Sequence, residues 1–408
     1  MARSPVPARL VTALLAAALT ATACAGKPAD DGTFAVWDPY PQFDDSSDWV
    51  EVIEQCGEQA GVTITRQSFD TTDLTNKVLL AAQQGTAPNV LVVDNPVVST
   101  LAEAGVVKSN EDSGLDATAA APNLVAAATT GEQTYGVPIG ANTLALYYNK
   151  AVLASANVDP ASVTDWAGLD AALAKVAAAG KKGITFSAVG TEEGTFQFLP
   201  WFWGAGAELT DLSSADATAA LALWKSWLDK GYAPNSVINN TQTTSWQEFA
   251  TGEYAFAENG TWQLGNADKA GFEYGVIPVP ARDGGVAPAP TGGEFVTVPV
   301  QGDADAEAKA ATIAECLTSP KTVFDTDKAL TYVSAVPSVQ ERQISAAPDF
   351  AVWVDAVNAA KGRTSDGLGT RYPRISEQLW KAVQVALTGS KSPGEALSDA
   401  QAAAQKAK

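Results

Sequence analysis

The sequence predicts an α/β protein that folds into two lobes. Short apolar runs alternate with segments of about 10 to 15 residues that have helical spacing. This pattern is typical of βαβ units, so we expect mostly parallel sheets with helices on their faces. The chain has 408 residues, more than one hydrophobic core usually supports. Two lobes follow from its length.

The first strands and helices can be followed along the chain. The expected elements are strands at 33–37, 63–67 and 89–93 and helices at 46–60 and 72–84. The second helix should begin at Thr72 as its cap and end before Gly85. Ligands bind beyond the carboxyl ends of the strands in such sheets. These ends carry Trp37 and Asp38, then Asp94 and Asn95, which we take as candidate ligand contacts.

The N-terminus has the pattern of an export signal. Arg3 and Arg9 precede an apolar run at 10–19, too short to span a bilayer at about 20 residues. The run leads to Ala-Thr-Ala-Cys24, which resembles the lipobox of bacterial lipoproteins, where the Cys is acylated. A lipobox usually has Leu where this chain has Ala21, so ordinary cleavage after residue 23 is the alternative. We expect a signal peptide at 1–23, lipidation at Cys24 and a tether at 24–32.

Charge narrows the choice of partners. The formal net charge is −20, which repels nucleic acid and anionic lipid headgroups. No later run of 18 apolar residues is present to span a membrane. We therefore expect an extracytoplasmic monomer that binds no nucleic acid and is held at the outer face of the cell membrane by its lipid.

The remaining cysteines, Cys56 and Cys316, both lie on apolar faces with helical spacing. In an oxidising compartment they either form a disulfide or remain two buried thiols. The chain has no His and only isolated Cys, so we expect no zinc site and no cofactor.

Aromatic residues gather in two places that invite a functional interpretation. The segment TEEGTFQFLPWFWGAGAEL (191–209) holds Phe196 and Trp201 beside Glu192 and Glu193. Such a cluster is either hydrophobic core or part of a site. Trp262 comes just after the Asn-Gly pair of ENGTWQL. Because Asn-Gly favours left-handed backbone, the preceding strand should stop there. Trp262 then either fills the core or presents a flat face to a ligand.

A sugar suits this combination of residues. A sugar ring has an apolar face that stacks on Trp or Tyr, and its hydroxyls donate to Asp, Glu or Asn. The chain has 11 Trp beside one Met and no His. These Trp residues either serve such a site or fill two large cores.

Five segments resemble, in order and spacing, the extracellular sugar-binding proteins of ABC importers, the family 1 solute-binding proteins of the maltose-binding type. They are VPIGANTLALYYNK (137–150), SWQEFATGEYAFAENGTWQL (245–264), YGVIPVPA (274–281), PTGGEFVTVP (290–299) and LWKAVQVALTGSKSPGEALSDAQ (379–401).

The resemblance implies a type II periplasmic-binding-protein fold, with a doubly wound sheet in each lobe and three crossings between the lobes. The crossings should fall near 141–144, near Gly292 and near 334–337. The expected boundaries are 33–142 plus 293–334 for the N-lobe and 143–292 plus 335–408 for the C-lobe. Cys56 and Cys316 then share the N-lobe, so the resemblance also implies their disulfide.

The resemblance also assigns a ligand site. Trp262 and Phe196 fall at stacking positions, as does Trp380, for which a core role is the alternative. Asn142 stands where the maltose-binding type has a Glu. Arg363 we interpret as a solvated surface charge. The ligand-binding set is Trp37, Asp38, Asp94, Asn95, Asn142, Glu193, Phe196, Trp201, Trp262, Gly293, Glu294 and Trp380.

The implied function is capture of a small-molecule sugar without chemistry, followed by delivery to the permease subunits of an ABC transporter. Two alternatives remain open. The same clamp could take a peptide or osmolyte, although no Arg–Asp pair for a zwitterion is evident near the cleft positions. A secreted glycosidase could use Glu192 with Glu193, or Asp38 with Glu294, as acid and base.

Overall fold

The computed structural model of the protein describes residues 33–364 and 367–406. The expected signal peptide, the lipid attachment at Cys24 and the tether at 24–32 lie outside the described residues. Within the described part of the chain, no helix combines the length and the apolar character needed to cross a membrane.

The first lobe is built on a five-stranded sheet with the strand order β2-β1-β3-β11-β6. Its strands are β1 (Thr33–Asp38), β2 (Thr63–Ser68), β3 (Val90–Asp94), β6 (Val137–Pro138) and β11 (Glu294–Thr297). Strand β1 pairs in parallel with β2 and β3, whereas β11 is antiparallel to β3 and β6. Strand β11 therefore returns to this sheet from a distant part of the chain.

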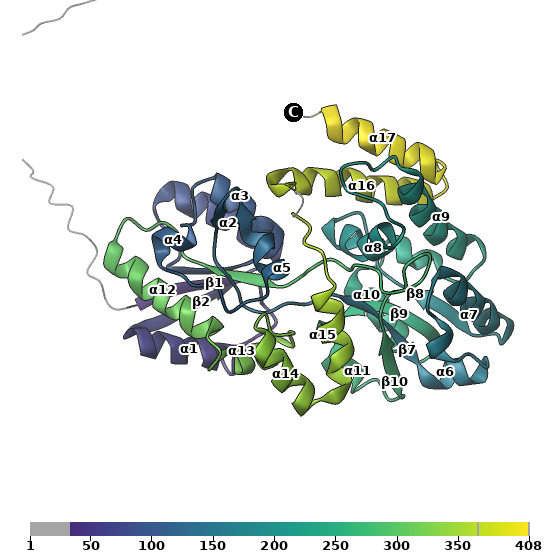
Figure 1. Ribbon diagram of the computed structural model, residues 1–408, viewed down its shortest axis with the longest axis horizontal. Coiled ribbons are helices and arrows are strands. Elements are labelled where there is room, and N and C mark those ends of the chain that lie inside the picture. The colour runs from purple at the N-terminus through teal and green to yellow at the C-terminus, as the bar shows by residue number, and fades with distance from the viewer. Residues whose placement is uncertain (1–32, 365–366, 407–408) are drawn as a thin grey trace, which may run out of the picture. The chain divides into compact units, whose positions relative to one another are not determined.

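Helices cover both faces of this sheet (Figure 1). They are α1 (Asp48–Ala60), α2 (Thr71–Gln84), α3 (Asn95–Glu103), α4 (Asn110–Ser113), α5 (Pro122–Val125), α12 (Ala304–Thr318) and α13 (Val323–Leu330). In β3, Val90 and Val92 join the cluster that includes α1 and α12, while Leu91 and Val93 join the cluster that includes α2 and α3. Successive side chains of a strand point to opposite faces, so a strand buried on both faces must be apolar throughout.

The helix starts differ slightly from the expectation. Helix α1 begins at Asp48, and the side chain of Ser47 accepts a hydrogen bond from the backbone N–H of Val50 as its N-cap. Helix α2 begins at Thr71, one residue before the expected cap, so Asp70 occupies the N-cap position. Both corrections are within the usual uncertainty of a helix end.

A disulfide joins Cys56 of α1 to Cys316 of α12, with Cα atoms 5.6 Å apart. Both helices pack on the same face of the first sheet. The bridge implied by the resemblance is therefore present and lies within one lobe.

The second lobe is built on a four-stranded sheet with the order β10-β7-β9-β8. Its strands are β7 (Leu144–Asn149), β8 (Lys182–Thr185), β9 (Tyr254–Gly260) and β10 (Tyr274–Ile277). Only β8 and β9 are parallel, and β7 runs antiparallel to β9 and β10. The expectation of a mostly parallel sheet is wrong here, because β9 and β10 return beside β7 in the opposite direction.

The second lobe carries most of the remaining helices. They are α6 (Lys150–Ser155), α7 (Trp166–Ala178), α8 (Glu192–Gly204), α9 (Ala215–Asp229), α10 (Gln242–Phe249), α11 (Leu264–Ala267), α14 (Pro337–Ala346), α15 (Ala351–Asn358), α16 (Tyr372–Leu387) and α17 (Pro393–Lys406). Short elements complete the chain: strands β4 (Thr129–Thr130) and β5 (Gln133–Thr134), and 3-10 helices η1 (Ala126–Ala128), η2 (Pro160–Ser162), η3 (Asn235–Ile238), η4 (Thr261–Gln263), η5 (Pro348–Phe350) and η6 (Gly369–Arg371). Helix α16 packs against α8, α9 and α17.

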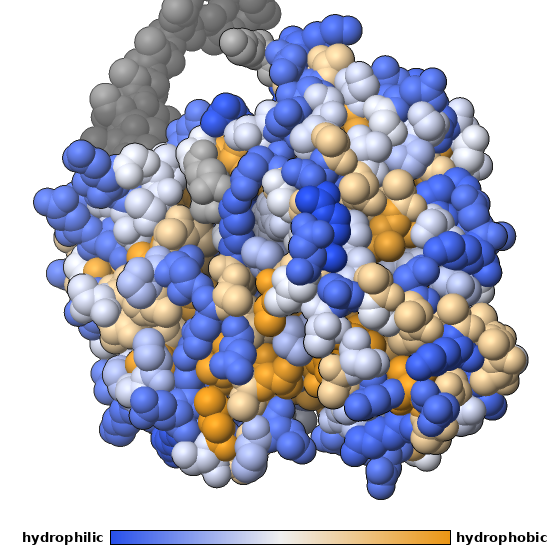
Figure 2. Space-filling model, turned by 45° about the vertical axis from the view of Figure 1, so that its right-hand side comes forward, coloured by the Kyte–Doolittle hydropathy of each residue, from blue (hydrophilic) through white to orange (hydrophobic). Residues whose placement is uncertain are grey.

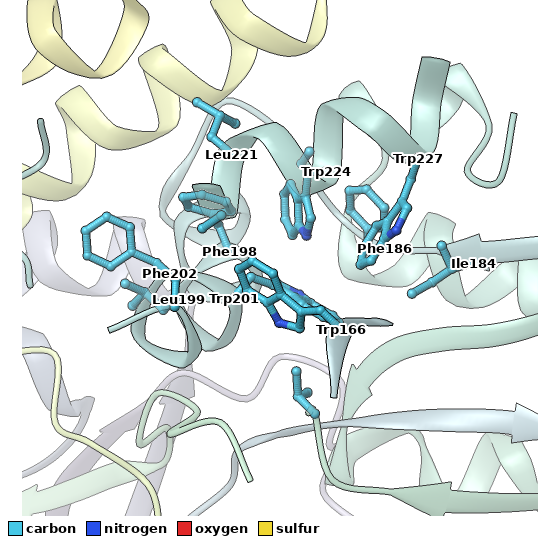
Figure 3. Packing of buried hydrophobic residues seen from close by; sticks show 14 of the residues in the cluster. Trp166, Ile184, Phe186, Phe198, Leu199, Trp201, Phe202, Leu221, Trp224 and Trp227 are labelled. Carbon is cyan, nitrogen blue, oxygen red and sulfur yellow. The ribbon is translucent and has the colours of Figure 1, made fainter. Parts of the chain in front are cut away.

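The aromatic segment of α8 forms the core of the second lobe. Figure 3 shows Trp201 among Trp166, Trp224 and Trp227, with phenylalanine rings beside them. Trp201 is fully buried, and its ring contacts that of Trp227 edge-on at 5.0 Å between centroids. Its indole N–H donates to the Oε2 atom of Glu258 at 2.8 Å. Trp201 is therefore a core residue, whereas the sequence had suggested a ligand contact.

Strand β9 does not stop at the Asn-Gly pair. Asn259 and Gly260 both belong to the strand and pair with β7, and Gly260 has a φ of −111°. The expectation of a left-handed corner is therefore wrong. The structure gives another reason for the glycine: a Cβ atom at Gly260 would lie 2.1 Å from the ring of Trp262. Gly260 is there because the indole folds back over it.

Three chain segments connect the lobes and lie side by side. Ala141 exchanges two backbone hydrogen bonds with Val333, at 2.8 and 2.9 Å. Asn142 does the same with Gly292, at 2.8 and 3.2 Å. Gly293 has a φ of +100°, and a Cβ atom there would lie 2.5 Å from the carbonyl oxygen of Gly140. Only glycine fits this close contact between two crossings.

The outer surface is largely hydrophilic. Figure 2 shows polar residues over most of one face, with hydrophobic residues gathered mainly in its lower middle. Among the described residues the large hydrophobic side chains that are exposed are Leu80, Val286 and Val300. Such a surface agrees with the strongly negative net charge of the chain.

Candidate functional site

A cavity of about 740 Å³ is lined by residues of both lobes. Its walls include residues of α2, of the start of α3, of α8 and of α16, together with the crossings at Asn142 and Gly292. The lining residues are Thr75, Asn76, Asp94, Pro96, Val97, Thr100, Asn142, Thr191, Glu192, Glu193, Phe196, Gln242, Trp262, Gly292, Gly293, Glu294, Arg363, Tyr372, Pro373 and Trp380. The volume is within the range of small-molecule sites.

The structure brings eight of the twelve expected site residues to this cavity. These are Asp94, Asn142, Glu193, Phe196, Trp262, Gly293, Glu294 and Trp380. The other four, Trp37, Asp38, Asn95 and Trp201, do not line it.

Two of these four have structural partners in the first lobe. Asp38 is fully buried and forms an ion pair with Arg66 at 2.5 Å, and it accepts a hydrogen bond from the indole of Trp49 at 3.1 Å. Trp37 packs edge-on against Phe69. The carboxyl end of β1 therefore supports the fold, whereas the carboxyl end of β3 reaches the cavity.

Asn95 does not line the cavity but contacts a residue that does. It is fully buried, and its amide donates to the carbonyl of Thr291 at 2.7 Å. Its Oδ1 atom accepts a hydrogen bond from Arg363 at 3.3 Å. Asn95 thus orients a cavity residue and ties α3 to the second crossing.

Aromatic rings from the second lobe form one wall. Phe196 of α8 and Trp262 of η4 have ring centroids 6.3 Å apart and lie at 52° to each other. Both pack on Leu144 and Ala289. Trp380 of α16 is half-buried and faces the same cavity. Flat apolar faces of this kind suit a ring-shaped ligand.

Arg363 is the main correction to the sequence interpretation. Its side chain is only 2% exposed, so the expectation of a solvated surface charge is wrong. It donates to Asp94 at 2.9 Å and to Glu192 at 2.8 Å, and its guanidinium lies 4.9 Å from the centroid of the Phe196 ring. Burial opposes the charge, but the carboxylates of Asp94 and Glu192 outweigh it and hold the pKa of Arg363 above its ordinary value.

The Arg363 pairs join the two lobes across the cavity. Asp94 ends β3 of the first lobe, and Glu192 begins α8 of the second. The chain beside Arg363 also reaches the first lobe, because the hydroxyl of Thr364 donates to the carbonyl of Ala127 at 3.0 Å. An Arg–Asp pair therefore lies in the cleft, contrary to the sequence-based expectation. Its guanidinium is already shared between two acids.

Glu192 is held by several donors at once. Besides Arg363, its carboxylate accepts hydrogen bonds from the hydroxyl of Tyr372 at 2.5 Å and from the hydroxyl of Ser376. It lies in the first turn of α8, where the helix dipole favours a negative charge. Burial, and then the charge of Glu192, raise the pKa of Tyr372 well above its ordinary value. Glu192 thus fixes α16 to α8 beside the cavity.

Glu294 begins β11 on the first-lobe side of the cavity. Its Oε2 atom accepts hydrogen bonds from the hydroxyl of Tyr40 at 2.8 Å and from the hydroxyl of Tyr332. Burial and then the charge of Asp94 raise the pKa of Glu294 to about 7, although both tyrosine hydrogen bonds act in the other direction. Glu294 can therefore change its charge near neutral pH.

Glu193 is the fourth acid of the cavity. Its carboxylate accepts a hydrogen bond from the backbone N–H of Gln242, at the start of α10. Burial raises the pKa of Glu193, and this hydrogen bond offsets part of the effect.

Several of these residues were missed by sequence reasoning. Arg363 lies in a loop with no periodic pattern, and Tyr40 and Tyr332 lie far along the chain from the acid they hold. Glu192 was named beside the aromatic cluster and as a catalytic acid or base, but not as a partner of Arg363. The sequence held a signal against the assignment of Trp201 to the site. From residue 198 to 203, α8 is apolar on all sides, which indicates that this part of the helix is buried.

The arrangement is that of a binding site and not of a catalytic one. Two lobes, joined by three adjacent segments, enclose a cavity that is lined by aromatic faces of the second lobe and by acids of both lobes. This architecture defines a two-lobed clamp for a small solute.

Comparison with known protein families agrees with this class. The chain matches the model of the bacterial extracellular solute-binding protein family over residues 51–352, and it belongs to that family. The family consists of binding proteins of transporters and not of enzymes, which removes the glycosidase alternative.

Individual relatives refine the comparison. A maltooligosaccharide ABC transporter solute-binding lipoprotein of Streptococcus pneumoniae is 28% identical over 299 residues, or 68% of each chain. A solute-binding protein of Thermotoga lettingae, bound with α-D-tagatose, has a TM-score of 0.77 and 24% identity, covering 92% of this chain and 99% of its own. UgpB of Mycobacterium tuberculosis, in complex with glycerophosphocholine, has a TM-score of 0.80 and 20% identity, covering 92% and 98%. These structures share the fold.

Proposed function

We propose that this protein captures a carbohydrate in the cavity between its lobes and delivers it to the permease subunits of an ABC importer. The observation that carries this proposal is the cavity itself, where aromatic rings and acid or amide side chains line one space of about 740 Å³. Sugar rings stack on the former and donate hydroxyl hydrogen bonds to the latter. The named substrate of the Streptococcus pneumoniae relative supports the same class.

Closure of the lobes gives the mechanism its physical basis. Phe196, Trp262 and Trp380 belong to the second lobe, whereas Asp94 and Glu294 belong to the first. A bound sugar gains both sets of contacts only when the lobes are closed, so binding shifts the population toward the closed form. We further propose that the protein is a monomer held to the outer face of the cell membrane by a lipid on Cys24, after removal of residues 1–23.

A thermal-shift screen tests the substrate class. At a free ligand concentration a hundred times the dissociation constant, binding should raise the free energy of unfolding by about 2.7 kcal/mol. The panel should contain mono-, di- and trisaccharides, with choline, glycine betaine and a tripeptide as non-sugar solutes. Response to the non-sugar solutes alone would overturn the proposal.

Trp262→Ala provides the matching variant. Loss of a stacking aromatic face should weaken sugar binding by about 2 kcal/mol or more, measured by titration calorimetry. Tyr232→Ala is the control, because Tyr232 is also half-buried but does not line the cavity. Equal affinity of the wild-type protein and Trp262→Ala would remove this residue from the site.

A non-sugar solute remains a second candidate, since the Mycobacterium tuberculosis structure contains glycerophosphocholine. Glycerophosphocholine carries an anionic phosphodiester and a cationic choline, and the described residues that line the cavity include four carboxyl groups and one guanidinium. Like charges at this range repel. The charge of the cavity therefore disfavours the phosphodiester of this ligand, whereas its cationic choline would be attracted to the carboxyl groups.

A further inference from the structure

Two acids lie directly opposite each other at the edge of the first sheet. Asp94 at the end of β3 and Glu294 at the start of β11 are Cα partners in the antiparallel ladder. Directly opposed residues have Cβ atoms about 4.5 to 5.5 Å apart, and like charges in such pairs are destabilising. Both side chains line the cavity. The fold thus directs two carboxyl groups into the same part of the site.

Neighbouring side chains neutralise the charge of these two acids, and satisfy their oxygen atoms, only in part. Arg363 donates to Oδ1 of Asp94, but the same guanidinium also serves Glu192. Within the described part of the chain, Glu294 accepts hydrogen bonds only at Oε2, from two neutral tyrosine hydroxyls. Among the described residues, no donor is within hydrogen-bond distance of Oδ2 of Asp94 or Oε1 of Glu294. Each acid therefore keeps one oxygen atom for a ligand.

The rest of the cavity adds negative charge. Glu192 and Glu193 also line it, and Arg363 is the one cationic side chain among the described lining residues. Burial raises the pKa of Glu193. Burial and then the charge of Asp94 raise the pKa of Glu294, and the charge of Arg363 opposes part of this effect. Both shifts have the direction that burial of an acid produces. A neutral ligand would leave this excess of negative charge enclosed when the lobes close.

An ammonium group on the ligand would neutralise this excess negative charge. It carries three N–H donors and a full positive charge, and the free carboxylate oxygens are acceptors only. Hydrogen bonds between charged partners are roughly twice as strong as neutral ones. The aromatic faces of Phe196 and Trp262 lie in the same cavity, so a ring can stack on them while its substituent reaches the first sheet.

We propose that the carbohydrate bound here carries a protonated amino group, and that Asp94 and Glu294 hold its ammonium. This inference rests on the proposed function and narrows its substrate class to amino sugars. Arg363 faces the same region and would repel a cation. Its charge, however, is offset by two carboxylates, so the balance at the Asp94–Glu294 pair stays negative.

Matched pairs of sugars that differ only in one substituent test the inference. Suitable probes are D-glucosamine with D-glucose, D-galactosamine with D-galactose, and the chitosan disaccharide with cellobiose. We expect the amine of at least one pair to bind about tenfold or more tightly than its hydroxyl partner by titration calorimetry at pH 7.5, where Glu294, with a pKa of about 7, is mostly ionised. Raising NaCl from about 50 to 500 mM should weaken the binding of the amine and not that of the neutral sugar.

Glu294→Gln identifies the acid involved. The variant keeps an acceptor for Tyr40 and Tyr332 but lacks the negative charge, so the dissociation constant of the amine should rise about tenfold more than that of its hydroxyl partner. Glu54→Gln on the exposed side of α1 makes the same change in net charge away from the cavity. It should leave both constants unchanged.

Each other outcome contradicts the inference. Equal or tighter binding of the neutral partners would overturn it and leave the proposed sugar-binding function standing. Amine binding that is unaffected by Glu294→Gln would also overturn it. If no amine probe binds, the inference fails, and the neutral sugars of the wider panel then decide the proposed function separately.

Discussion

Replacing Arg363 by Met should lower the free energy of unfolding of the protein substantially. The change removes a guanidinium that is 2% exposed and leaves Asp94 and Glu192 without their shared partner. Breaking a buried ion pair by removal of one member typically costs 3 to 5 kcal/mol. Glu192 keeps 36% of its side chain exposed, so solvent compensates part of the loss. We expect the free energy of unfolding to fall by about 3 kcal/mol.

A double-mutant cycle separates the ion pair from the lost packing. The variants Arg363→Met, Asp94→Asn and their combination should be unfolded in urea and followed by both tryptophan fluorescence and far-ultraviolet circular dichroism. Coincident transitions justify a single free energy. Residues in direct contact should show a coupling energy of at least about 1 kcal/mol.

Arg282→Met is the matched control. Arg282 pairs with Asp216 at 2.7 Å, but the two side chains are 33% and 41% exposed. Surface pairs of this kind contribute less than about 1 kcal/mol. The reasoning is refuted if Arg363→Met lowers the free energy of unfolding no more than this control does. It is also refuted if the double-mutant cycle shows no coupling energy, because Arg363 then does not hold the lobes together.

Three further predictions follow from buried groups. The pKa of Glu294 is about 7 in the folded protein, against 4.5 for an ordinary Glu. Its contribution to the free energy of unfolding is therefore complete below about pH 4.5. This contribution, roughly 2 to 3 kcal/mol, is lost as the pH rises through 7. Glu294→Gln should flatten this part of the urea-unfolding profile between pH 5 and 8.5, and an unchanged slope would contradict the assignment. Replacing both Cys56 and Cys316 by Ala should lower the free energy of unfolding by about 4 kcal/mol, because the bridge spans 260 residues of chain; equal stability of the variant and the oxidised wild-type protein would count against it. Trp201→Phe should lower the free energy of unfolding by about 2 kcal/mol, because it leaves Glu258 without its hydrogen-bond donor. It should change the affinity for sugar less than threefold. A large loss of affinity would show that Trp201 belongs to the site.

The sequence was sufficient for features that depend on local pattern. Alternating apolar runs predicted the α/β class, and two adjacent strand ends identified Asp94 near the cavity. Trp262 was singled out by its Asn-Gly neighbours, although the stated reason was wrong. Gly260 adopts extended backbone, and it is glycine because the indole ring lies against it.

Features that depend on distant partners could not be read from the sequence. Arg363 is 269 positions from Asp94, and Tyr40 is 254 positions from Glu294. No spacing rule links residues at such separations, because only the fold places them together. Trp201 and Phe196 show the same limit within one helix. Both are aromatic and five positions apart on α8, yet one faces the core and the other the cavity.

The position of the disulfide decides how the molecule responds to proteolysis. The covalent loop between Cys56 and Cys316 contains the exposed turn at 283–286. A protease that cuts this turn would leave both fragments joined through sulfur, so they would separate on a gel only after reduction. The exposed stretch at 345–349 lies outside the loop. A cut there would leave the C-terminal segment, which carries Arg363 and Trp380, with no covalent link to the rest.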